Sequence, residues 1–239
     1  MRSLIKYFKL IQYGLQVRMM IAFTFIFLGL GILFEVSGVF NDSNMGLSGL
    51  YMGLAGMYLY QLVITTAVSK FIKASPMKYE ILTKAPVLVT IFPLMITFTI
   101  FALLRIFYSV RVRGAQLGPD GVALAYIGIL QAAVVAFLMF IYLGFCYKNF
   151  ILSLVLTMII LLPLVFGAQL PVVTRFEIDM FRKMSDAFSE GGALAVIMIL
   201  SYILLGIGAL GCYLVNKLTY RMELSELAYR NAMRQAAKS

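Results

Sequence analysis

Six long apolar runs, separated by short polar or charged stretches, dominate the pattern of hydrophobic and polar positions along this chain. They lie at residues 19–40, 47–68, 87–107, 122–146, 150–168 and 192–215. Each is long enough for a helix to cross the hydrocarbon core of a bilayer. Glu35 and Pro163 are compatible with spans, because a late Glu can reach the interface and membrane helices tolerate proline. The pattern therefore predicts an all-α integral membrane protein with six transmembrane helices.

The segment before the first apolar run is amphipathic. Its apolar side chains recur at helical spacing, with Lys6 and Lys9 beside them; they are Leu4, Ile5, Phe8, Ile11 and Leu15. This pattern is typical of a helix in the inner membrane interface, and a simple basic anchor is an equal alternative. We expect a single domain, with an interfacial helix at 1–18, a membrane domain at 19–215 and a tail at 216–239.

A second amphipathic segment precedes the last apolar run. Residues 172–190 are too polar to cross a membrane, yet apolar side chains recur there at every fourth position; they are Phe176, Met180, Met184 and Phe188. The spacing predicts a helix whose aromatic face dips into the outer leaflet or caps an outward opening. A solvated surface helix is the alternative. Gly191 and Gly192 then release the chain into the last span.

The short basic stretch between the second and third apolar runs is bounded by helix signals. Ser75 followed by Pro76 is typical of a helix N-cap with proline at the first helical position. Pro86 disfavours helix at the residue before it, Ala85. The sequence therefore predicts a separate helix of about two turns at 76–84, outside the spans.

The second apolar run opens with glycines on one helical face. The four positions are Gly46, Gly49, Gly53 and Gly56. Because small residues let helix backbones approach closely, this face favours packing against another helix. That helix belongs either to the same subunit or to a second copy of the protein. A face that lines a substrate path is a third alternative.

The distribution of charge predicts the orientation in the membrane. Six spans put both termini on one side, and that side, with the 70–84 loop and Lys148, carries 14 of the 20 lysines and arginines. The opposite side carries seven of the ten acidic residues. By the positive-inside rule, both termini and the loop are cytoplasmic, and we expect a plasma-membrane protein. The net charge of +10 then reflects topology and inner-leaflet lipids, not nucleic-acid binding.

The residue types needed for catalysis are missing. The chain has no histidine, which excludes Ser-His and Cys-His nucleophilic pairs and histidine metal sites. No glycine-rich loop ends in Gly-Lys-Ser or Gly-Lys-Thr, so the chain lacks the Walker route to ATP hydrolysis. We therefore expect that the chain is not an enzyme and that it binds no cofactor itself. Cys146 and Cys212 fall near predicted cytoplasmic helix ends, where no disulfide is expected.

Few polar groups fall inside the apolar runs. Gln61 and Gln131 are the main ones, and such amides serve either as contacts between helices or in transport. Glu35 and Arg105 both come late in their runs, at the predicted outer ends of the helices. We expect Arg105 to reach the outer interface, and we hypothesise that it pairs with Glu35.

This layout resembles the permease subunits of ABC exporters of the ABC type-two class. The shared features are the basic amphipathic lead, six spans, a helix-forming cytoplasmic loop after span two and an amphipathic outer segment before span six. Residues 74–84 are also similar to the small-Pro-x-basic-x-Glu-Ile stretch that such permeases often carry. Lys70 and Lys73 depart from the acidic residues usual just before it.

The resemblance implies a permease that works with a separate nucleotide-binding ATPase. Two permeases, either two copies or two homologues, would combine with two ATPases, which bind the ATP and magnesium. The implied docking surface for the ATPase consists of Ser75, Pro76, Met77, Lys78, Glu80, Ile81 and Lys84. The expected substrate is an amphiphile, such as a peptide, a lipid or a drug-like molecule, moved outward by alternating access. A channel or secondary carrier without an ATPase, and a non-transporting scaffold or immunity protein, are the alternatives.

Overall fold

The computed structural model describes residues 17–40, 47–68, 72, 74–107, 114–167, 170–222, 224–226 and 229–230. Every regular element in these ranges is helical, as the apolar runs predict. The elements are α2 (Val17–Phe40), α3 (Leu47–Ile64), η2 (Thr65–Val68), α5 (Lys78–Thr83), α6 (Ala85–Ile106), α7 (Gly114–Cys146), α8 (Phe150–Leu156), η4 (Thr157–Leu161), α9 (Leu162–Gly167) and α10 (Pro171–Leu218). The predicted interfacial helix at 1–18 lies almost wholly outside the described residues. Gly46, the first glycine of the predicted face, also lies outside them.

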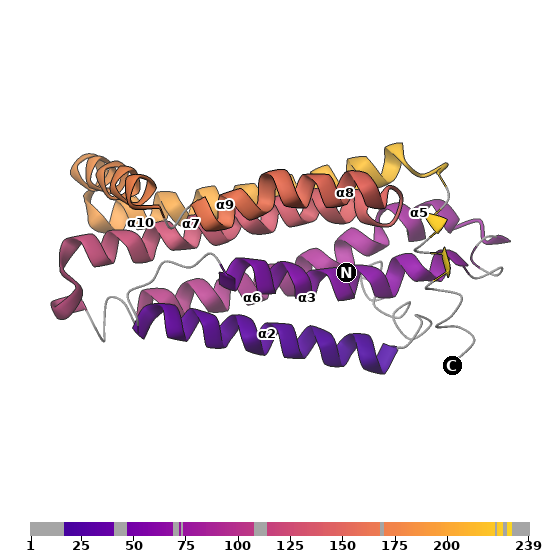
Figure 1. Ribbon diagram of the computed structural model, residues 1–239, viewed down its shortest axis with the longest axis horizontal. Coiled ribbons are helices and arrows are strands. Elements are labelled where there is room, and N and C mark those ends of the chain that lie inside the picture. Colours follow the sequence, from indigo (N-terminus) through magenta and orange to yellow (C-terminus); the bar gives the residue numbers. More distant parts are fainter. Residues whose placement is uncertain are drawn as a thin grey trace.

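The long helices run along the long axis of an elongated bundle (Figure 1). Four segments in the described chain are long and apolar enough to cross a membrane; they are Val17–Ser37, Ala85–Ile106, Gly121–Cys146 and Pro171–Leu218. The chain is therefore an all-helical protein with several helices of membrane-spanning length. The count of six spans stays a prediction, because α3 has 18 residues and the fifth apolar run is interrupted.

The fifth apolar run is broken into three pieces. The helices α8 and α9 flank η4, a five-residue π-helical segment. Pro163 lies near the start of α9 and has no backbone N–H to donate to the preceding turn, which favours a local change in hydrogen bonding there. The run that was expected to be one span at 150–168 is thus a helix with a π-segment in its middle.

The helix α10 is also interrupted. It contains one residue with non-helical dihedral angles, Ser189, at φ 66° and ψ 165°. A positive φ is rare for a residue with a side chain. The Ser189 hydroxyl accepts a hydrogen bond from the Gly192 N–H at 3.4 Å, as an N-cap does at the start of a new helix. The break that the sequence suggested at Gly191 and Gly192 therefore falls two residues earlier.

The bundle is held together by close contacts of α7 with α3 and α10. A Cβ atom on Gly49 would lie 2.9 Å from the backbone of Ala132 in α7, and one on Gly208 would lie 3.1 Å from the Cα atom of Phe137. Further along α3, Gly53 faces the Met139 side chain in α7. The described glycines of the α3 face thus pack against helices of the same chain, the first of the three alternatives.

Candidate functional site

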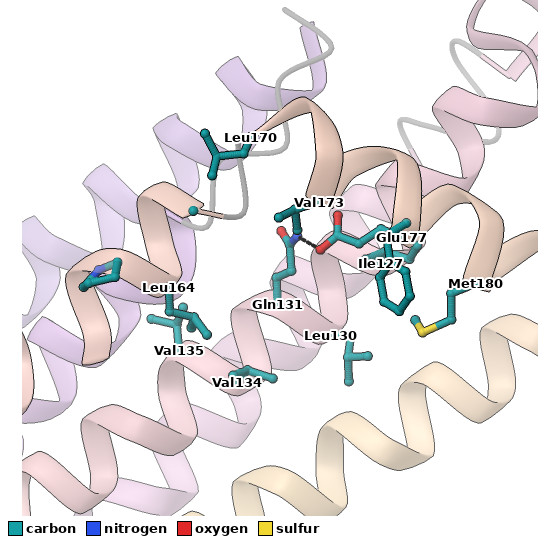
Figure 2. A pocket seen from close by; sticks show the side chains of 13 residues that line it. Ile127, Leu130, Gln131, Val134, Val135, Leu164, Leu170, Val173, Glu177 and Met180 are labelled. Carbon is teal, nitrogen blue, oxygen red and sulfur yellow. Dashed lines mark hydrogen bonds between the residues drawn. The ribbon is translucent and has the colours of Figure 1, made fainter. Parts of the chain in front are cut away.

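A cavity of about 430 Å³ lies between α7, α9 and the first part of α10 (Figure 2). Its described lining residues are Ile127, Leu130, Gln131, Val134, Val135, Pro163, Leu164, Gly167, Leu170, Val173, Phe176, Glu177 and Met180. Apart from Gln131 and Glu177, this lining is apolar. A mostly apolar cavity with a few converging polar groups is the usual form of a small-molecule site.

The two polar residues meet across the helices. The Gln131 amide nitrogen, on α7, donates a hydrogen bond to one carboxyl oxygen of Glu177, on α10 (Figure 2). The other carboxyl oxygen of Glu177 and the amide oxygen of Gln131 are buried, and neither has a hydrogen-bond partner among the described residues. Burying an acceptor without a partner costs about 1–3 kcal/mol, so this pair is only half satisfied. It can accept hydrogen bonds from a bound molecule.

The sequence identified one member of this pair. Gln131 was singled out as a polar group inside an apolar run, and the structure places it in a contact between helices that also lines a cavity. Glu177 lies in the 172–190 segment, which was described from the sequence as too polar to cross a membrane, and it was not singled out there. The signal that could have found it is the i+4 series of Val173, Glu177 and Phe181, in which Phe181 is buried against Tyr126.

The inward face of the first part of α10 differs from the predicted aromatic face. Phe176 and Phe188 are 68% and 60% exposed, although Phe176 borders the cavity, while Met180 is a more buried part of the cavity lining and Met184 packs against the core. The buried aromatic ring belongs to Phe181, which is edge-on to Tyr126 of α7 at 5.6 Å between ring centroids. The helix is therefore packed on α7 through a neighbouring stripe. Contact of the exposed rings with the outer leaflet stays a prediction.

The predicted cytoplasmic helix is shorter than expected and is not separate. Helix α5 runs from Lys78 to Thr83, and Pro76 lies in the turn before it, where the Ser75 hydroxyl accepts the Met77 N–H at 3.2 Å. The expectation that Pro86 keeps Ala85 out of a helix is wrong, because Ala85 is the first residue of α6. Proline is tolerated in the first turn of a helix, where its missing N–H has no partner to lose.

Helix α5 is hydrogen-bonded to the end of α10, which is in turn hydrogen-bonded to α3. The Tyr60 hydroxyl of α3 donates to the Asn216 side-chain oxygen of α10 at 2.6 Å. The Asn216 amide nitrogen donates in turn to the backbone carbonyl of Thr83 in α5 at 3.4 Å. All three residues are buried. At the surface of the same end, Tyr79 is edge-on to Tyr220, and the Lys78 ammonium lies 5.9 Å from the centroid of the Tyr220 ring.

The residues of the implied docking surface differ in accessibility. Pro76 and Lys84 are exposed, and four others are partly buried, namely Ser75, Met77, Lys78 and Glu80. Ile81 is 5% exposed and belongs to the main hydrophobic core. Its place in the docking surface is therefore wrong, because its side chain is covered by this chain. The accessible part is the Pro76 turn and the α5–α6 junction at Lys84.

Glu35 and Arg105 form an ion pair, as hypothesised from the sequence. The Arg105 Nε donates to a carboxyl oxygen of Glu35, which joins the end of α2 to the end of α6. The two residues are 3% and 5% exposed. The Arg105 guanidinium is buried with its partner rather than exposed, and its position at the outer interface stays a prediction. Gln61, the second polar group noted in the apolar runs, is partly buried near the end of α3.

No group of three or more His, Cys, Asp or Glu side chains in the described part of the chain is arranged to hold a metal ion. Cys146 and Cys212 are both free thiols, and Cys212 is fully buried. Comparison with protein-family models, curated proteins and solved structures finds no match to this chain. The function is therefore argued from the residues and their geometry.

Proposed function

We propose that this chain is the transmembrane permease subunit of an ATP-driven exporter. A separate ATPase would supply the energy, and a second permease, identical or homologous, would complete the transmembrane unit. The observation that carries the proposal is the structure of α5. It is a short helix at one end of the bundle, it is joined to α6 through Lys84 alone, and it is hydrogen-bonded to Asn216 of α10, which also binds Tyr60 of α3.

These contacts would transmit a force applied to α5 by the ATPase to the long helices. A displacement of α5 moves α6 directly, since one residue separates them. Through Asn216 it also acts on α10, whose first part forms one wall of the cavity at Glu177. Packed helices move as rigid elements, so a shift at Asn216 is carried along α10 as far as the break at Ser189 and, through the contact of Gly208 with Phe137, to α7, which also lines the cavity. Binding of ATP by the partner would thereby open and close the cavity.

The cavity fits an amphiphilic substrate better than an ion or a sugar. Its lining is apolar except for one carboxyl and one amide group. A sugar needs many hydrogen-bonding partners, and a small ion would exchange most of its hydration for contact with apolar side chains, because only two polar side chains line the cavity. A molecule with an apolar body and one small polar end satisfies both parts of the site.

Purification in a mild detergent from the native host tests the proposal, and it should recover a nucleotide-binding ATPase with the chain. Lys84→Glu reverses an exposed charge at the α5–α6 junction and should weaken this association. Lys183→Glu is the matched control, because Lys183 is also exposed but lies on the first part of α10. Failure to recover an ATPase in several detergents, or equal loss with both variants, contradicts the proposal.

A second experiment separates docking from transmission. Asn216→Leu removes the side chain that bridges α3, α5 and α10 and leaves the exposed surface of α5 in place. The ATPase should stay bound while ATP-driven transport falls. If binding and transport are lost together, or if neither changes, the bridge does not transmit the movement.

A secondary carrier is the alternative that one observation favours. Carboxyl groups in the membrane region of a protein often couple transport to protons or ions, and Glu177 is such a group in an otherwise apolar cavity. This function predicts transport in vesicles that persists without ATP, follows an ion gradient and is abolished in Glu177→Gln. Transport that needs ATP and its partner excludes it.

A further inference from the structure

The buried oxygens that lack a hydrogen-bond partner indicate which chemical group a ligand of the cavity should carry. The amide nitrogen of Gln131 already donates to one carboxyl oxygen of Glu177. The two buried oxygens that remain, one on each side chain, are acceptors. What they lack is therefore hydrogen-bond donors. A hydroxyl group donates one hydrogen bond, whereas a protonated amine with two or three N–H groups can donate to both oxygens.

Charge points to the same ligand. The described lining of the cavity contains one acidic side chain, Glu177, and no lysine or arginine. A carboxylate or phosphate group would meet the Glu177 carboxylate with no cation to offset it. A protonated amine would instead pair with the carboxylate, and hydrogen bonds between charged groups are about twice as strong as neutral ones.

The shape and lining of the cavity indicate that the rest of the ligand is apolar. Val134, Val135 and Leu130 lie on α7 below the polar pair, and Leu164 lies opposite them on α9 (Figure 2). Its volume of about 430 Å³ is in the range of small-molecule sites. Two residues of the rim, Leu170 and Phe176, are exposed, so an apolar chain can enter from the side of the bundle.

We propose that this cavity binds an amphiphilic amine, with its ammonium group on Glu177 and Gln131 and its apolar chain along α7 and α9. The transport of such an amine rests on the proposed function, but its binding requires this chain alone. The proposal narrows the substrate class from amphiphiles in general to primary or secondary alkylamines, including peptides or lipids that present such a group.

The chain offers an unusually clean fluorescence assay, because it contains no tryptophan. Leu164→Trp places a single tryptophan on α9 beside the apolar part of the cavity, where the bromine end of the chain is expected, and at a position exposed enough to accept the larger ring. Phe92→Trp is the matched control, because Phe92 is exposed on α6 and does not line the cavity. Both variants are reconstituted in lipid nanodiscs and titrated with 11-bromoundecylamine, whose bromine quenches tryptophan on contact.

The expected result is saturable quenching of the tryptophan at position 164 and a shallow, non-saturating response at position 92, which reports partition of the amine into lipid. Added to Leu164→Trp, the change Glu177→Gln should weaken amine binding by about tenfold or more, since it removes the charge but keeps an amide next to Gln131. Binding of 11-bromoundecanol should change little in the same variant.

Two further ligands test the role of the N–H groups. The trimethylammonium analogue keeps the charge without any N–H donor and should bind at least several times more weakly than the amine. The carboxylic acid analogue should not give saturable quenching. Equal binding of amine and alcohol, or of amine and trimethylammonium, overturns the assignment, as does quenching that is equal at positions 164 and 92.

Thermal unfolding of the unaltered chain provides a second measurement that needs no reporter. Unfolding exposes the buried thiol of Cys212 to a thiol-reactive dye, and dodecylamine should raise the transition temperature while dodecanol does not. Absence of this shift overturns the proposal. Because no ATPase is present in either assay, a failure of amine binding is distinguishable from a failure of the permease assignment, which rests on copurification.

Discussion

The two ends of α10 make polar contacts of opposite kinds. Near its C-terminal end, Asn216 both accepts a hydrogen bond from Tyr60 and donates one to Thr83. Near its N-terminal end, Glu177 accepts one hydrogen bond from Gln131, and an oxygen on each partner is left without one among the described residues. Both contacts have largely apolar surroundings. The contrast suggests that the first contact fixes the structure and the second is kept for a ligand.

The physical reason is the cost of an unsatisfied buried acceptor. A satisfied polar contact in an apolar environment orients the helices that share it, at little net cost. A half-satisfied contact lowers stability, and proteins keep such contacts mainly where function requires them. Substitutions that act on each contact separately test whether the two contacts differ in this way.

The largest effect should come from a third polar contact, the buried ion pair at the opposite end of the bundle from α5. Arg105→Leu leaves the Glu35 carboxylate buried without its cation and should lower the free energy of unfolding by about 3 kcal/mol. Thermal unfolding in detergent, followed by thiol labelling of Cys212, measures this. The exchange Glu35→Arg with Arg105→Glu should recover part of the loss, and no recovery would mean that the pair itself does not hold α2 to α6.

The next effect concerns the close approach of α3 to α7, on which the position of Tyr60 depends. Gly49→Ala adds a Cβ atom 2.9 Å from the Ala132 backbone and should destabilise the bundle by about 1–3 kcal/mol. Gly29→Ala is the control, because nothing lies within 4 Å of its added Cβ atom. The same unfolding assay applies. Equal stability of the two variants would show that α3 and α7 can separate without cost.

A smaller effect is expected at the satisfied contact. Asn216→Leu removes two hydrogen bonds and leaves the Tyr60 hydroxyl and the Thr83 carbonyl without this partner. Side-chain hydrogen bonds within membrane proteins are worth about 0.6–1.7 kcal/mol, so the loss should be about 1–2 kcal/mol. Tyr60→Phe removes only the first of the two bonds and should cost less. An unfolding temperature unaffected by Asn216→Leu contradicts a structural role for the contact.

The smallest effect on stability should come from the half-satisfied contact. The double variant Gln131→Leu, Glu177→Leu removes both unsatisfied oxygens together with the hydrogen bond between the two residues. Replacing both partners by apolar groups is close to neutral or stabilising. The unfolding temperature should therefore stay the same or rise, while amine binding is lost. A clear fall in stability would place this pair in the same structural class as Asn216.

Local signals in the sequence were reliable where one helix was involved. The apolar runs indicated the long helices, and the glycine spacing on α3 indicated a close-packed face. Counting residues from the membrane entry points put Glu35 and Arg105 at the same depth, which was enough to pair them. It was not enough to show that the pair is buried, because burial depends on how α2 and α6 pack against α3 and α7.

Signals at helix junctions were less reliable. Pro86 was expected to keep Ala85 out of a helix, and Pro163 was expected to lie within one continuous span; neither proline indicated the local structure that is found. Pro86 lies in the first turn of α6, so α5 and α6 are almost continuous. The break in α10 falls at Ser189 rather than at the glycines that follow, because the serine hydroxyl caps the helix that begins there.

The sequence by itself determined that this is an all-helical protein with several apolar helices of membrane-spanning length, because hydrophobicity and length are properties of each segment alone. It also indicated that Gln131 is exceptional within its helix. Only the tertiary structure decided that Glu177, on a segment classed as polar, turns towards Gln131, and that Asn216 joins α5 to α3 and α10. These contacts join residues 46 and 133 positions apart, and no local pattern records the rotation of one helix against another.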